Sequence, residues 1–110
     1  MKLPNAATAV VEKRKIVEYL LCRSHVDGAG KAEFFIRHGF KLERWQVLAD
    51  ALRRHGQQHE VTNAVESPFG FRYSVDGELQ TPDGRNPTVR TVWIIEKVED
   101  RPRLVTAHPA

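Results

Sequence analysis

The chain has 110 residues, the usual length of one domain, and its 41% hydrophobic and 28% charged residues are ordinary for a globular protein. A formal net charge of +3 permits a polyanionic partner without requiring one. The single cysteine, Cys22, excludes an internal disulfide and a Cys-x-x-Cys zinc site. No apolar run approaches the ~20 residues of a membrane span, and the first residues lack the apolar block of a signal peptide. We therefore expect one cytoplasmic domain, residues 1–110, without membrane contact.

Three helices are predicted in the first half of the chain, where apolar residues recur at spacings of three and four. The first is expected over about 8–22, the second over about 31–38 and the third over about 42–54. Glycines are expected to break or end these helices, because glycine favours the left-handed backbone of a helix cap. These glycines are Gly28, Gly30, Gly39 and Gly56.

After Gly56 the hydrophobic period changes from 3.6 to 2, which is typical of strands. The predicted strands cover residues 59–65, 69–75, 78–81, 88–97 and 103–108. Asp76-Gly77 is a two-residue hairpin signal between the second strand and its short return strand. Within the strand expected over residues 88–97, the run from Val92 to Ile95 is apolar on both faces, as in a central strand. The predicted fold class is α+β, with three N-terminal helices packed on one face of a four- to five-stranded antiparallel sheet.

Familiar nucleotide-binding, metalloprotease and serine-hydrolase motifs are absent, and no cofactor is expected. The segment from Asp27 to Lys31, DGAGK, resembles part of a phosphate loop but lacks the preceding strand and the following Ser or Thr. It is interpreted either as an anion-binding helix start or as a plain turn with a solvated Lys31.

Basic residues and histidines of the second half suggest a different chemistry. Arg90 is expected to share a sheet face with Val92 and Ile94, and a face that carries Arg, Thr and His would suit a metal-free ribonuclease. His25 lies in a loop between helices and His108 ends the last strand, so the fold could bring them together. Two alternatives stay open. One is a set of scattered surface arginines: Arg72, Arg85, Arg90, Arg101 and Arg103. The other is a metal-dependent enzyme that uses His55, His59 or carboxylates.

Several motifs, including LPNA, GAGKAEFF, YSVDGELQTPDGRNPTVRTVWIIE and LVTAHP, resemble a family of small bacterial domains described as a domain of unknown function. A looser resemblance, helices followed by an antiparallel sheet that ends in LVTAHP, links the chain to the barnase/EndoU/RelE-type ribonuclease toxins. That group typically cleaves RNA without a metal, using varied sets of side chains on the sheet. The resemblance implies site residues from the terminal strand, its neighbour and the helical side: Thr106, His108, Arg90, Thr91, Lys31 and His25.

Two functional hypotheses follow from these observations. The first is a metal-independent, RNase-like toxin or toxin-derived domain with the catalytic set His108, Arg90, Thr106, Lys31 and His25. The second is a non-catalytic interaction or nucleic-acid-binding module of a small bacterial two-gene system. The expected partners are therefore RNA, or a cognate antitoxin or neighbour protein. A homodimer could also form through the edge strand expected at residues 59–65.

Overall fold

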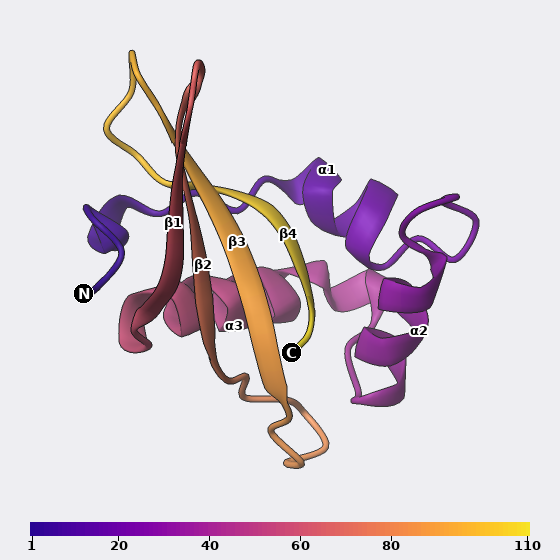
Figure 1. The fold of residues 1–110 in the computed structure, drawn as a ribbon. Coiled ribbons are helices and arrows are strands. Elements are labelled where there is room, and N and C mark those ends of the chain that lie inside the picture. Colours follow the sequence, from indigo (N-terminus) through magenta and orange to yellow (C-terminus); the bar gives the residue numbers. More distant parts are fainter.

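A computed structural model describes all residues, 1–110, and shows an α+β domain whose helices precede a four-stranded antiparallel sheet (Figure 1). Strand order in the sheet follows the chain, β1-β2-β3-β4. The elements are α1 (Lys13–Lys15), which continues into a π-helical segment (Ile16–Leu20), α2 (Ala29–Arg37), α3 (Trp45–Gln58), β1 (Val61–Ser67), β2 (Gly70–Glu78), β3 (Thr88–Glu96) and β4 (Arg103–Pro109). Short 3-10 turns occupy Ala6–Thr8 and Leu42–Arg44.

The helices surround the sheet unevenly. In Figure 1, α3 lies across the back of the sheet, whereas α1 and α2 lie beside the β4 edge and no helix covers the front. The buried core includes Trp93 of β3, Leu52 of α3 and Phe35 of α2, all with less than 2% exposure. We call the uncovered front the open face. None of the helices has the length and apolar content needed to cross a bilayer.

The first predicted helix is wrong in extent, because its beginning adds to the sheet instead. The N–H of Val10 donates to the Pro102 carbonyl at 2.8 Å, and the N–H of Leu104 donates to the Val10 carbonyl at 3.0 Å. These bonds form a parallel bridge at the edge of β4, where Ala9 and Val11 are buried. The sheet edge thus satisfies backbone groups that a helix would otherwise have to pair.

The hairpin predicted at Asp76-Gly77 is also wrong, and with it the short return strand at 78–81. β2 runs straight through these residues, with Asp76 opposite Arg90 and Gly77 opposite Val89 on β3. Gly77 is needed for packing, because a Cβ atom there would lie 2.3 Å from the ring of His59. The connection is a longer loop over residues 79–87, so the sheet has four strands.

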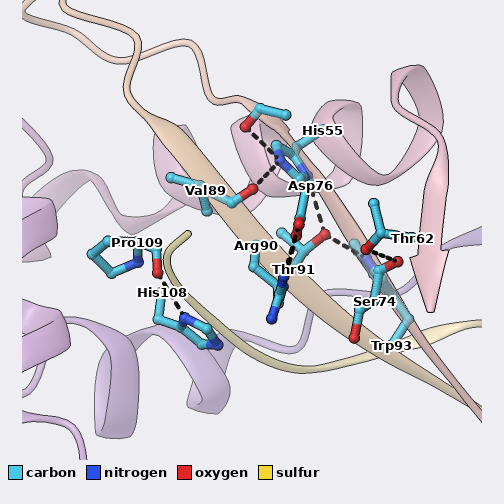
Figure 2. Close-up of polar contacts among 11 residues, drawn as sticks. His55, Thr62, Ser74, Asp76, Val89, Arg90, Thr91, Trp93, His108 and Pro109 are labelled. Atoms are coloured by element: carbon cyan, nitrogen blue, oxygen red, sulfur yellow. Dashed lines mark hydrogen bonds and ion pairs between the residues drawn. The ribbon is translucent and has the colours of Figure 1, made fainter. Parts of the chain in front are cut away.

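Gly56 does not end the third helix, since α3 continues to Gln58. The glycine instead lets α3 approach the sheet closely, because a Cβ atom there would lie 2.6 Å from the Trp93 ring. Next to it, His55 is 2% exposed, and its Nε2 donates to the carbonyls of Val89 at 2.8 Å and Gly77 at 3.0 Å (Figure 2). Helix and sheet are therefore joined by both close packing and buried hydrogen bonds.

The hydroxyl of Thr91 completes this buried network. It donates to Nδ1 of His55 at 3.0 Å and accepts the indole N–H of Trp93 at 2.8 Å (Figure 2). Thr91 therefore belongs to the covered face, and the resemblance that placed it beside Arg90 in a site is wrong for this residue. Both ring nitrogens of His55 serve the core, which leaves the metal-binding interpretation of His55 and His59 without support.

Candidate functional site

A cleft of about 690 Å³ lies where the helical side meets β4. Its walls come from α1, the π-helical segment, the loop before α2 and the middle of β4. The lining residues are Glu12, Arg14, Lys15, Glu18, Tyr19, His25, Asp27, Val105 and Thr106. Two of the predicted site residues, His25 and Thr106, therefore line one cleft although 81 positions separate them in the sequence.

Tyr19 is the residue that joins the two sides of the cleft. Its hydroxyl lies 3.1 Å from Oγ1 of Thr106, and its ring meets the His25 ring edge-on with 4.9 Å between centroids. The ammonium groups of Lys15 and Lys31 each lie 5.4 Å from the centroid of the Tyr19 ring. A phenol and two lysines thus gather beside the imidazole, in an arrangement that favours cation–π attraction.

The loop before α2 holds His25 in one orientation. Nδ1 of His25 accepts the backbone N–H groups of Asp27 and Gly28, each at 3.0 Å. The loop can pass this close to Tyr19 only because residue 28 is glycine, since a Cβ atom there would lie 2.5 Å from the Tyr19 carbonyl oxygen. Lys31 folds back so that its Nζ donates to the Asp27 carbonyl at 3.1 Å. The DGAGK segment is therefore held beside the cleft by its hydrogen bonds to His25 and by the hydrogen bond of Lys31 to the Asp27 carbonyl.

The open face of the sheet carries the other predicted residues next to the cleft. Strand register pairs Arg90 with His108 and Val92 with Thr106 across β3 and β4, and side chains of directly paired residues share a face. Thr106 and His108 are two residues apart on β4, so they also lie on that face. The Nδ1 atom of His108 donates to the Pro109 carbonyl at 2.9 Å (Figure 2).

Arg90 is not a free cation. Its Nε and Nη2 atoms donate to the two carboxylate oxygens of Asp76 at 2.7 and 2.8 Å (Figure 2). These hydrogen bonds hold the pKa of the Asp76 carboxyl below its ordinary value and raise the pKa of Arg90. Asp76 therefore compensates the charge of Arg90, although 42% of the arginine side chain stays exposed. Arg85 and Arg103 are ion-paired too, so the arginines form no single anion-binding cluster.

The sequence and the fold of this chain were compared with those of known proteins. The family model described as Domain of unknown function (DUF6883) matches residues 2–110. The chain belongs to this family. The family resemblance seen in the sequence is thus confirmed, and no curated protein matches the DUF6883 domain.

A solved structure of similar fold gives a further comparison for the DUF6883 domain. It is a chain of the contact-dependent growth inhibition toxin–immunity protein complex from Klebsiella pneumoniae 342, with a TM-score of 0.71 and 16% sequence identity. The match covers 94% of this chain and 95% of that chain. At this level of identity the likeness establishes a shared fold.

Three of the predicted site residues, His25, Lys31 and Thr106, lie around Tyr19 in the candidate site. The other two, Arg90 and His108, lie on the open face beside Thr106. Tyr19 was not named because it sits in the π-helical segment, where Leu21 N–H bonds to the Ile16 carbonyl at 2.8 Å. That extra residue in the turn shifts side chains away from the directions that a 3.6-residue period predicts.

Proposed function

We propose that the DUF6883 domain is a toxin-related, RNase-like domain that cleaves RNA without a metal. The observation that carries the proposal is the set of contacts of Tyr19, whose hydroxyl meets Thr106 and whose ring meets His25 and Lys31. Thr106 lies two residues before His108 on the same strand. The fold likeness supports it, because the similar chain comes from a complex described as a growth inhibition toxin with its immunity protein. Fold likeness alone does not assign an activity, so the argument rests on the side chains.

Metal-free RNA cleavage has three requirements, and side chains of the candidate site fit the first two. A base must take the 2′-hydroxyl proton, donors and cations must stabilise charge on the phosphate, and the leaving oxygen must be protonated. The imidazoles of His25 and His108 supply proton-transfer and donor groups, and Lys15 and Lys31 supply positive charge. Glu12, Glu18 and Asp27 also line the cleft. We therefore expect the phosphodiester to lie nearer to Thr106 and His108 than to that acidic rim.

The test is incubation of the purified chain with total RNA in the presence of EDTA. We expect cleavage, lowered about 10²–10⁴-fold in His108→Ala, because that is the usual contribution of a positioned acid or base. Tyr19→Phe should also lower the rate, since it removes only the hydroxyl that meets Thr106. Arg54→Ala is the matched control, because Arg54 is exposed on α3, away from the site. Intact RNA with the unaltered chain would overturn the proposal.

A second candidate function is binding to a partner protein, such as a cognate antitoxin or immunity protein. The β1–β2 and β3–β4 connections lie at the top of Figure 1. Phe69 and Val98, exposed by 75% and 90%, come from these two connections and line one hollow together with Ile94, and we call these three residues the apolar patch. Contiguous exposed apolar surface is typical of protein interaction sites. The similar chain also comes from a two-protein complex.

Co-expression with a protein encoded beside it would test the partner function. A stable complex is expected, and Phe69→Asp and Val98→Asp should each weaken it by about tenfold or more, the effect of losing about 1.4 kcal/mol. Val26→Asp is the control, because Val26 is 95% exposed in the loop before α2 and lies outside the apolar patch. Equal binding by all three variants would remove this patch as the contact surface.

A further inference from the structure

The two histidines of the site are held in opposite tautomers by the backbone. Nδ1 of His25 accepts two backbone N–H groups, from Asp27 and Gly28 at 3.0 Å each. A backbone N–H can only donate, so Nδ1 of His25 carries no proton and the neutral ring carries its proton on Nε2.

His108 has the reverse arrangement. Its Nδ1 lies 2.9 Å from the Pro109 carbonyl oxygen, and a carbonyl oxygen can only accept, so Nδ1 carries the proton. In the neutral ring of His108, Nε2 therefore has a free lone pair, and no protein group bonds to it. One imidazole thus offers an N–H, and the other offers a proton acceptor.

We propose that His108 is the proton acceptor of the reaction and that His25 is a hydrogen-bond donor to the phosphate through its Nε2–H. This division of roles rests on the proposed function. Nε2 of His108 takes the proton of the 2′-hydroxyl as its oxygen bonds to phosphorus, and the bond from phosphorus to the 5′ oxygen breaks. The 5′ oxygen leaves with the electron pair and takes a proton from solvent, to which His108 later returns its own. Nε2–H of His25 donates to a non-bridging phosphate oxygen as charge builds there.

Charged side chains lie near both histidine rings and also act on which ring nitrogen carries the proton. The groups around His25 are Tyr19, Lys31 and the charged cleft residues Glu12, Arg14, Lys15, Glu18 and Asp27. His108 faces Arg90 across the sheet, and the carboxylate of Asp76 lies on the far side of that arginine. The charges around His25 are mixed in sign, and the Asp76–Arg90 pair beside His108 is close to neutral. The backbone contacts therefore decide the tautomers.

Two measurements test this proposal on the full chain. Long-range ¹H–¹⁵N NMR of the ring nitrogens at about pH 8 should show the proton of His25 on Nε2, because Nδ1 accepts two backbone N–H groups. In the same spectra His108 should show Nδ1–H with a free Nε2. A His25 ring that carries its proton on Nδ1, or a His108 ring that carries it on Nε2, would overturn the assignment.

Cleavage of a short single-stranded RNA in EDTA tests the roles. His108→Gln, which cannot take up the proton of the 2′-hydroxyl, should lower the rate about 10²–10⁴-fold. His25→Ala should lower the rate about 10²-fold, the usual cost of losing one such donor, and His25→Gln, which keeps an N–H, should recover part of it. Equal rates for His25→Gln and His25→Ala, or full activity of His108→Gln, would overturn the division of roles alone. No cleavage by the unaltered chain would overturn the proposed function itself, while the NMR tautomers would still be measured independently.

Discussion

Replacing Thr91 with valine would keep the shape of a buried side chain while removing the hydroxyl that joins α3 to the sheet. Thr91 and Trp93 have no exposed surface, and His55 is 2% exposed. The change leaves two buried polar groups without partners, Nδ1 of His55 and the indole N–H of Trp93. Each such group costs roughly 1–3 kcal/mol, and the added methyl group offsets about 0.8 kcal/mol. We therefore expect Thr91→Val to lower the free energy of unfolding by about 1–5 kcal/mol.

Urea unfolding followed by far-UV circular dichroism measures this loss. Thr88→Val is the matched control, because Thr88 is exposed on the same strand and its side chain makes no hydrogen bond. The control should change the free energy of unfolding by no more than about 0.5 kcal/mol, as is usual for surface substitutions. If Thr91→Val unfolds at the same urea concentration as Thr88→Val, the buried network does not hold helix and sheet together as described.

Three further predictions concern the core and the cleft. Burial lowers the pKa of His55 in the folded chain. As the pH drops below about 6.5, the unfolded chain therefore binds a proton at this residue before the folded chain does. The free energy of unfolding should fall over this range, by at most about 1.4 kcal/mol per pH unit. Urea titrations should show this slope, and it should be absent in His55→Asn. Gly28→Ala should lower the free energy of unfolding by about 1–3 kcal/mol through overpacking. Gly30→Ala should raise it by up to about 1 kcal/mol, because nothing lies within 4 Å of the new Cβ atom. A melting temperature that is higher for Gly28→Ala than for Gly30→Ala would contradict this packing. Gly56→Ala should lower the melting temperature, because its Cβ would meet the ring of Trp93.

The sequence predicted those elements whose patterns are local. The period of 3.6 placed α3 to within a few residues of its start, and the period of 2 placed β3 and β4. It failed where a distant contact overrides a local preference. Asp76-Gly77 is a hairpin signal in isolation, but Arg90 binds the carboxylate and the His59 ring fills the space above the glycine. Tertiary contacts therefore keep β2 extended through a turn sequence.

The same reasoning explains how much of the site could be found. His25 was predicted from its place in a loop between helices, and Thr106 from the resemblance of the terminal strand. The sequence did not show that Tyr19 lies between them, because this depends on the direction of one side chain in a π-helical turn. The pairing of Arg90 with Asp76 was likewise hidden, because the predicted hairpin put Asp76 in a turn rather than opposite Arg90. Strand register determines which charged side chains lie opposite one another and form ion pairs, and no short sequence motif encodes it.

The most direct test of the central claim uses two short RNAs in EDTA that differ only by a 2′-hydroxyl or a 2′-hydrogen at the cleaved position. If the 2′-oxygen attacks the phosphorus as proposed, the purified chain yields a 2′,3′-cyclic phosphate from the first RNA and leaves the second intact. Equal cleavage of both RNAs, or of neither, would contradict the account.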